Sequence, residues 1–185
     1  MRKIVAGLFV SLDGVFESPD QWHFPYFNDE MGEAVGAQMA ESDAMLLGRQ
    51  TYEEFAGFWP QQGSEVDGAD HMNTTPKFVV STTLASAAWQ NTTVIRGNLG
   101  EALTRLKQQP GKEIAVVGSG TLVRSLLRDN LLDELRLLVH PIVVGHGKRL
   151  FPDGTDQQPL KLVESKTFGT GVLYLTYQLA DTPSA

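Results

Sequence analysis

The chain has 185 residues, 42% of them hydrophobic, with no cysteine and a formal net charge of −7 at pH 7. This length favours a single domain over residues 1–185, and the lack of cysteine excludes disulfides, thiolate metal sites and thiol nucleophiles. The negative charge argues against nucleic-acid and anionic-membrane partners, and no apolar run is long enough to span a membrane. We therefore expect a soluble, cytoplasmic protein, and its charge does not exclude a discrete site for a small molecule.

The first part of the chain predicts a buried strand, a long loop and a helix. The nearly continuous apolar run Lys3–Ser11 is typical of a central strand that is buried on both faces. Residues 12–27 are rich in glycine, proline and aromatic side chains, which predicts an ordered loop, and loops of this length tend to be functional. Asn28 or Asp29 can then cap a helix that reaches to about Ala40.

Short strands and helices continue to alternate after this helix. Strands are predicted over Ala44–Leu47, Lys77–Ser81 and Thr92–Ile95, and helices over Gly48–Phe58 and Leu99–Gln108. The polar stretch Gln61–Thr75 predicts an exposed loop.

A strand, a glycine turn and a helix are predicted within Ile114–Asn130. Gly118 and Gly120 lie where the strand passes into the helix, so backbone N–H groups can approach a ligand at a helix N-terminus. This is the geometry of a phosphate or pyrophosphate cradle. A tight strand-to-helix turn also favours glycine for structural reasons alone, and the residue pattern leaves both interpretations open.

The last part of the chain predicts only strands, at Glu134–Ile142, Leu160–Thr167 and Val172–Gln178. Gly169–Gly171 would join the last two as a hairpin. The whole order predicts an α/β fold with a mostly parallel sheet, helices on both faces and antiparallel strands at one end. The small, polar tail Ala180–Ala185 is expected to fray.

Four segments, in this order and spacing, resemble the dihydrofolate reductase fold, and more closely its branch that contains the reductase domain of bacterial riboflavin biosynthesis. They are GRQTYE at Gly48–Glu53, VSTTL at Val80–Leu84, VGSGTL at Val117–Leu122, and the stretch Asp133–Phe151 that ends in GHGKRLF. The resemblance implies a dihydrofolate reductase-like mixed, mostly parallel sheet of about eight strands flanked by about four helices, with an antiparallel C-terminal hairpin.

The resemblance further implies that NADPH lies across the carboxyl ends of the parallel strands. Gly48, Arg49 and Thr51 at a helix start would contact cofactor phosphates, because guanidinium, hydroxyl and free helix N–H groups all donate to phosphate. The pyrophosphate would be held by one turn, made of Gly118, Ser119, Gly120, Thr121 and Leu122.

The adenosine 2′-phosphate would lie near Ser81, Thr82 and Thr83. Relatives often carry Arg or Lys in this stretch, where this chain has threonines. Arg96, at the end of the following predicted strand, is the candidate for the missing positive charge. If Arg96 does not supply it, a preference for NADPH over NADH is in doubt.

Two carboxylates are candidates for substrate contact and protonation. Folate-reducing members carry a carboxylate on the first helix, where Asp29 is the best placed here, with Glu30 and Glu33 nearby; an N-cap or first-turn role for Asp29 is an equal alternative. Ser11 and Asp13 resemble the riboflavin-branch segment after the first strand, where Asp13 would face substrate or nicotinamide. The alternative for Asp13 is a plain Asx turn.

Aromatic side chains of the long loop offer a wall for a flat ring. Trp22 and Phe27, with Phe24 and Tyr26, suit stacking on a pterin, pyrimidine or nicotinamide, or they plug into the core, as aromatic side chains more commonly do. The four histidines show no metal-ligand spacing, so no metal site is expected, and His140 is expected to be a core or interface residue.

The resemblance, carried by these segments, implies an NADPH-dependent reductase that transfers a hydride to a C=N or carbonyl carbon of a heterocyclic or ribosylamino-pyrimidine-like substrate. One alternative is a nucleotide-binding or stress-related protein of the same fold without efficient turnover. Another is a scaffold that binds no cofactor. Because relatives in this branch commonly pair through their terminal strands, the resemblance also implies a homodimer, to which Glu134–Val144 would contribute.

Overall fold

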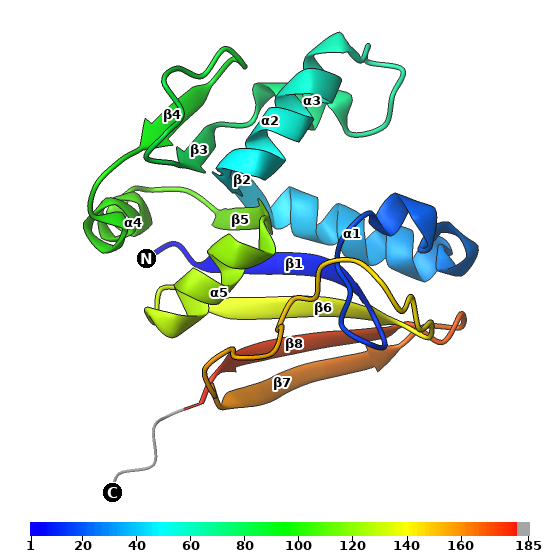
Figure 1. Cartoon of the computed structure of the whole chain (residues 1–185). Helices are drawn as coiled ribbons and strands as arrows, with labels where there is room; N and C mark the ends of the chain where they lie inside the picture. Colours follow the sequence, from blue (N-terminus) through cyan, green and yellow to red (C-terminus); the bar gives the residue numbers. More distant parts are fainter. Residues whose placement is uncertain (181–185) are drawn as a thin grey trace, which may run out of the picture.

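Figure 1 shows the computed structural model, which describes residues 1–180. The strands are β1 (Ile4–Ser11), β2 (Ser42–Gly48), β3 (Lys77–Val80), β4 (Thr92–Ile95), β5 (Glu113–Gly118), β6 (Glu134–His140), β7 (Leu160–Thr167) and β8 (Leu173–Leu179). The α-helices are α1 (Asp29–Glu41), α2 (Arg49–Phe58), α3 (Ala69–Thr74), α4 (Leu99–Gln108) and α5 (Gly120–Arg128). Three short 3-10 turns are η1 (Pro19–Gln21), η2 (Phe24–Tyr26) and η3 (Trp59–Gln61). The tail Ala180–Ala185 was predicted to fray, and its residues 181–185 lie outside the described residues.

All eight strands form one sheet, in the order β4-β3-β2-β5-β1-β6-β8-β7. The strands from β4 to β6 run parallel to one another, and β8 and β7 are antiparallel to their neighbours. β1 lies inside the sheet between β5 and β6, with most of its residues buried, which confirms the predicted central strand. The C-terminal hairpin is also confirmed, since the Gly171 N–H donates to the Phe168 carbonyl oxygen at 2.9 Å in its turn.

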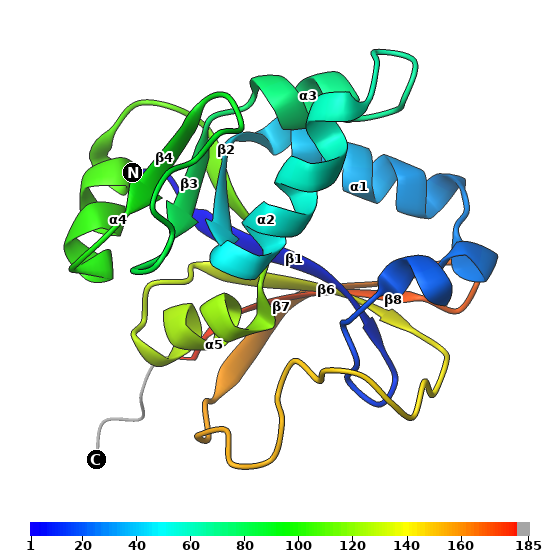
Figure 2. The same cartoon turned by 45° about the horizontal axis from the view of Figure 1, so that its top comes forward.

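Helices cover both faces of the sheet, and alternate residues of β2 show which helix lies on which face (Figure 2). Leu46 packs in one core cluster with Leu103 of α4 and Leu126 of α5. Its neighbour Leu47 points to the other face and packs with Tyr52 of α2. α1 and α3 also lie on this second face. No helix within residues 1–180 combines the length and the apolar character that a membrane crossing requires.

The prediction of a loop over Gln61–Thr75 is wrong, because this stretch contains α3. Gly68 begins the helix with a φ of 82°, and only two of the six helical residues, Ala69 and Met72, are buried. A helix this short presents less than two turns of apolar periodicity, which is too little to distinguish it from a polar loop.

Lys77 is the largest of the fully buried side chains and holds the end of α3 against the sheet. It is 0% exposed, and its Nζ donates to the carbonyl oxygens of Thr75 at 2.8 Å, Asn73 at 3.1 Å and Gln90 at 3.3 Å. The ammonium also lies 4.2 Å from the ring centre of Trp89. Burial lowers the pKa of Lys77 to about 8.

The free edge of the sheet beside the C-terminal hairpin belongs to β7, not to β6. β6 is paired on both sides, with β1 and β8, so it has no edge to offer to a second copy. β7 is paired only with β8, and its Leu162 and Val163 are 48% and 44% exposed. The homodimer and the contribution of Glu134–Val144 to it stay predictions; for pairing between strands of two copies, β7 is the strand of this hairpin with a free edge.

Candidate active site

The predicted cofactor residues gather at one edge of the sheet. Because β4, β3, β2, β5 and β1 are parallel neighbours, their carboxyl ends meet at the same edge. The segments that follow these ends, in that spatial order, begin at Arg96, Ser81, Arg49, Ser119 and Leu12. Ligands of open α/β sheets bind at this edge, where successive strands send their connections in different directions.

Two turns of this edge lie in direct contact, at the start of α2 and the start of α5. A Cβ atom added to Gly48 would lie 2.8 Å from Ser119 Oγ, and one added to Gly118 would lie 2.7 Å from Thr51 Oγ1. Real Cβ atoms do not approach other atoms so closely, so both positions require glycine. Gly118 also has a φ of 141°, and its peptide bond to Ser119 is cis. The structure therefore brings the GRQT and GSGT segments together into one surface.

The start of α5 offers backbone donors beside this contact. Ser119 is the N-cap, and its Oγ accepts the Leu122 N–H at 3.3 Å. Within residues 1–180, the N–H groups of Gly120 and Thr121 have no hydrogen-bond acceptor. The ring of Phe16, from the loop after β1, lies beside Gly120. A small anion at this end of α5 would meet two unpaired N–H groups and the positive end of a helix dipole.

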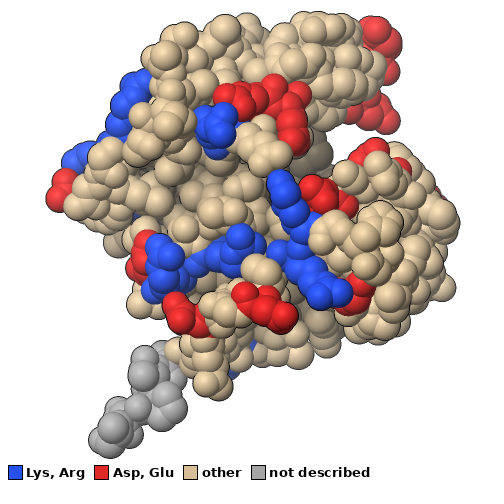
Figure 3. Space-filling view, viewed as in Figure 1, with Lys and Arg blue, Asp and Glu red and all other residues tan. Residues whose placement is uncertain are grey.

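Basic side chains surround the two helix starts. Arg49 of α2 is half-exposed and pairs with Glu53 at 2.9 Å, and Lys148 Nζ lies 3.5 Å from Gln50 Oε1 at the same helix start. Figure 3 shows Lys and Arg side chains gathered in a band over α5 and the segment after β6, although the chain as a whole is acidic. This local positive charge suits a phosphate-bearing ligand.

Ser81 organises the turn that was predicted to meet the 2′-phosphate. Its buried Oγ accepts the Thr83 N–H at 3.2 Å and the Leu84 N–H at 3.0 Å, while Thr82 and Thr83 are exposed. Arg96 follows the adjacent strand, and its guanidinium donates to the carbonyl oxygens of Leu84 and Ala85. The predicted proximity of Arg96 to this turn is thus present, and its role toward a 2′-phosphate stays a prediction.

Asp13 ties the loop after β1 to the segment after β6. Its carboxylate accepts from Ser11 Oγ at 2.5 Å and from the backbone N–H groups of Val144 and Gly145 at 3.0 and 2.9 Å. These hydrogen bonds, that from Ser11 first, hold the pKa of Asp13 well below its usual range. Glu17 makes a second tie, accepting the Lys148 N–H at 3.0 Å. Asp13 is therefore ionised at neutral pH and engaged in holding the loop.

The acidic start of α1 divides into free and engaged carboxylates. Asn28 is the N-cap, accepting the Met31 N–H at 3.0 Å, so Asp29 is a first-turn residue. Glu30 accepts the Gly169 N–H at 2.7 Å and thereby fastens the β7–β8 hairpin to α1. Asp29 is exposed and its carboxylate makes no hydrogen bond within the described part of the chain. Of the three candidate carboxylates on α1, Asp29 and the equally exposed Glu33 make no hydrogen bond within the described residues, so either is free to serve as a proton donor.

The two predicted wall residues have different surroundings. Trp22 is 7% exposed and packs edge-on against His140, at 5.2 Å between ring centres, whereas Phe27 is 50% exposed. His23 lies between them in sequence and is also buried, stacked on Phe9. The prediction that aromatics of this loop plug into the core therefore holds for Trp22. His23 was missed, because a lone histidine in an aromatic loop carries no periodic signal.

His140 is fully buried, as predicted for a core residue, yet it has one unpartnered nitrogen. Its Nδ1 lies 2.9 Å from the Leu138 carbonyl oxygen, and its Nε2 has no partner. The Nδ1 of His23 is likewise unpartnered. Burial lowers the pKa of both imidazoles, so both are neutral at pH 7.

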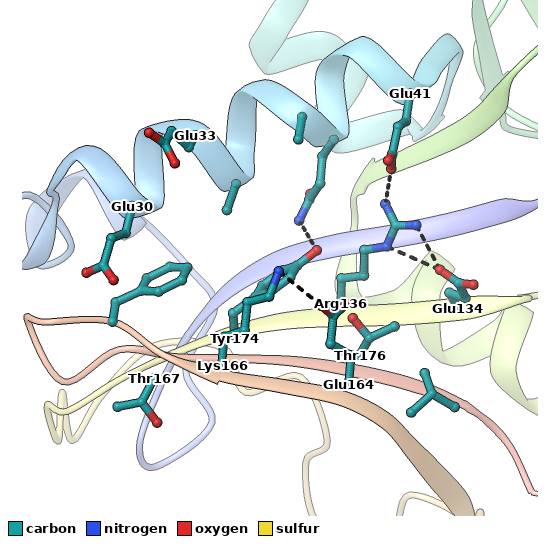
Figure 4. Close-up of a pocket in the computed structure, with 15 residues that line it drawn as sticks. Glu30, Glu33, Glu41, Glu134, Arg136, Glu164, Lys166, Thr167, Tyr174 and Thr176 are labelled. Atoms are coloured by element: carbon teal, nitrogen blue, oxygen red, sulfur yellow. Dashed lines mark hydrogen bonds and ion pairs between the residues drawn. The ribbon is translucent and has the colours of Figure 1, made fainter.

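A separate groove lies between α1 and the sheet strands β6, β8 and β7, with a volume of about 1120 Å³ (Figure 4). Of the candidate residues for cofactor and substrate, only Glu30 and Glu33, the two carboxylates named beside Asp29 on α1, line it. Its charged groups are largely paired with one another: buried Arg136 contacts Glu134 at 2.8 Å and Glu41 at 3.2 Å, and Lys166 contacts Glu164 at 3.0 Å. The groove is therefore not the predicted cofactor site.

The comparisons with known proteins agree with this architecture. Residues 2–174 match the family described as the RibD C-terminal domain. The uncharacterized protein YyaP of Bacillus subtilis is 30% identical over 180 residues, which cover 95% of this chain and 94% of YyaP. A putative riboflavin biosynthesis protein from Shewanella sp. PV-4 has a TM-score of 0.78 at 19% identity, covering 97% of this chain and 99% of that one. A dihydrofolate reductase from Enterococcus faecalis, complexed with NADP(H) and RAB-propyl, has a TM-score of 0.63 at 15% identity, covering 97% of each chain. The predicted dihydrofolate reductase-like fold is thus confirmed.

Proposed function

Because the chain belongs to the RibD C-terminal domain family, we propose that it is an NADPH-dependent reductase acting on a C=N or carbonyl carbon of a heterocyclic or ribosylamino-pyrimidine-like substrate. Support for a nicotinamide cofactor comes from the fold shared with the dihydrofolate reductase that was solved with NADP(H). Support for the substrate class comes from the family and from the putative riboflavin biosynthesis protein of the same fold.

The observation that carries the proposal is the contact between the starts of α2 and α5. A Cβ atom would be too close to Ser119 at Gly48 and too close to Thr51 at Gly118, so the two glycines let the helix starts lie side by side where a pyrophosphate would approach. The unpaired N–H groups of Gly120 and Thr121 and the guanidinium of Arg49 are donors of the kind that phosphate prefers. The donor set therefore fits a dinucleotide.

When bound, NADPH would supply the hydride, and the protein would supply orientation and a proton. Arg49, Thr51 and the Ser119–Leu122 turn would hold the phosphates, and Arg96 with Thr82 and Thr83 would meet the 2′-phosphate. Asp13 would keep the loop after β1 closed over the site. Asp29, as an exposed carboxylate near the end of that loop, would donate the proton.

One observation favours the alternative of a nucleotide-binding protein without efficient turnover. Two of the acidic residues near the predicted substrate side are engaged in structural hydrogen bonds, Asp13 to the segment after β6 and Glu30 to the hairpin. Asp29 and Glu33 are left, and both are exposed, so within the described residues no neighbour holds either carboxylate in place for proton transfer.

Loss of NADPH absorbance in the presence of ribosylamino-pyrimidine substrates distinguishes the two functions. A reductase consumes NADPH only when both protein and substrate are present, and Asp29→Asn slows that consumption. A binding protein without turnover binds NADPH and leaves its absorbance unchanged when substrate is added. Failure of NADPH to bind at all, at millimolar concentration, would contradict both functions.

A further inference from the structure

Residues 18–27 dock onto the rest of the protein without hydrogen bonds. Figure 2 shows this segment in blue, as short helical turns between the end of β1 and the start of α1. Within the described residues, each hydrogen bond of the segment goes to another residue of 17–27, such as the Trp22 indole N–H to the Glu17 carbonyl oxygen at 3.2 Å. Asp13 and Glu17 anchor only the chain before it. The segment is therefore held to the rest of the protein by the packing of its side chains.

The side chain that this segment inserts is a flat nitrogen heterocycle. The imidazole of His23 stacks on Phe9 of β1, with ring centres 4.8 Å apart and an angle of 13° between the ring planes. Phe24 of the same segment lies on the imidazole as well, with ring centres 4.2 Å apart. Phe9 thus already presents its face to a heteroaromatic ring.

His140 offers a hydrogen-bond acceptor beside this ring. A carbonyl oxygen can only accept, so the contact of Nδ1 with the Leu138 oxygen places the proton of the neutral imidazole on Nδ1. Nε2 is then a lone-pair acceptor that is buried and unpartnered. The rings of Phe9, Trp22 and Tyr26 stand edge-on around His140 and give it no donor for that lone pair. Buried acceptors of this kind nearly always have a partner in the functional state.

We propose that Phe9 and His140 form a subsite for a flat nitrogen heterocycle, and that His23 occupies this subsite as a built-in competitor. The ligand ring stacks on Phe9 in place of His23 and donates a ring or amino N–H to His140 Nε2, while residues 18–27 move outward. Only the identification of this ring as part of the substrate rests on the proposed function. His140 is in these terms a specificity residue, since a ring without an N–H leaves its acceptor unpaired.

Titration of the full-length protein with 5,6-diaminouracil tests the subsite, with tryptophan emission as the readout. Trp22 is 7% exposed, so departure of its segment shifts the emission to longer wavelength, and Trp22→Phe abolishes that change. His140→Phe, which keeps a flat ring but loses the acceptor, weakens binding about fivefold, and His140→Gln, which keeps an acceptor oxygen, restores it. His23→Ala removes the competing ring and strengthens binding about fivefold.

His140→Phe should weaken binding and His23→Ala should strengthen it, and these opposite effects distinguish the subsite from ordinary core packing. Wild-type affinity in His140→Phe, weaker binding in His23→Ala, or no saturable binding of 5,6-diaminouracil at millimolar concentration overturns the inference. If His140→Phe does not fold, as judged by circular dichroism, His23→Ala and His140→Gln decide the question. If free nicotinamide binds and changes the Trp22 emission while 5,6-diaminouracil does not bind, the subsite belongs to the cofactor. The assignment to the substrate is then wrong.

A parallel measurement of NADPH-induced thermal stabilisation keeps this inference apart from the proposed function. Stabilisation by NADPH without binding of 5,6-diaminouracil refutes the subsite alone. Binding of 5,6-diaminouracil that depends on His140, without any effect of NADPH, refutes the reductase alone.

Discussion

Replacing Gly48 with alanine should force apart the two turns that carry the predicted cofactor residues. The new Cβ would lie 2.8 Å from Ser119 Oγ and 3.2 Å from the Ser119 backbone nitrogen. Gly48 has a φ of −75°, so alanine meets no backbone strain there and the cost comes from overpacking alone. Overpacking of this kind lowers the free energy of unfolding by about 1–3 kcal/mol. Movement of the turn should also weaken NADPH binding.

Two further variants identify the cause of this effect. Gly57 lies in the same helix with no atom within 4 Å of its added Cβ, so Gly57→Ala should raise the free energy of unfolding by about 0.5–1 kcal/mol. Ser119→Gly removes the contacting side chain, so Gly48→Ala combined with Ser119→Gly should cost about 1 kcal/mol less than the sum of the single changes. Urea unfolding measures all of these free energies. Unchanged stability and unchanged NADPH binding in Gly48→Ala would refute the close contact.

Further predictions concern the cofactor site, the buried lysine, the loop tie and the free edge. Arg49→Ala should weaken NADPH binding about tenfold or more, since a charge-assisted hydrogen bond contributes about 1.5–3 kcal/mol. Arg105→Ala breaks a similar Arg–Glu pair on α4 and should leave NADPH binding unchanged. Calorimetry measures both affinities. The pKa of Lys77 falls from 10.5 to about 8 on folding, so the folded state releases its proton first and the free energy of unfolding should rise by about 3 kcal/mol as the pH is raised from 8 to 10.5. Lys77→Met should show no such rise in urea unfolding at these pH values. Asp13→Ala removes the acceptor of three hydrogen bonds, so thermolysin should cleave within residues 12–27 faster than in the wild type. Equal cleavage rates would contradict the role of Asp13 in holding this loop. Light scattering should give a homodimer that pairs through β7, and Leu162→Lys should give a monomer; a dimer that survives this change would place the interface elsewhere.

The order of elements could be predicted from the sequence because it depends on local patterns. The apolar run of β1 and the glycine turn between β5 and α5 each carry their signal within about ten residues, the range over which periodicity is legible. Parallel strands then dictate that the residues after their carboxyl ends share one edge. Gly48–Thr51 and Gly118–Leu122 could therefore be assigned to one site from the chain order and the resemblance.

The parts that could not be predicted depend on contacts between distant residues. Nothing near Asp13 in the sequence indicates that its carboxylate binds the N–H groups of Val144 and Gly145. The unpartnered nitrogen of His140 is also visible only in three dimensions, because it depends on which rings surround it. α3 was missed for a different reason, since a helix of six residues has too few buried positions to show a period.

Thermal unfolding of the full chain with NADPH, with NADH and without ligand tests the central claim most directly. A ligand at about 100 times its dissociation constant stabilises the folded state by about 2.7 kcal/mol, which for a chain of this size raises the melting temperature by about 5–10 °C. NADPH should give such a rise, and NADH should give a smaller one if Arg96 contacts the 2′-phosphate. No rise with either dinucleotide at millimolar concentration would contradict the cofactor site.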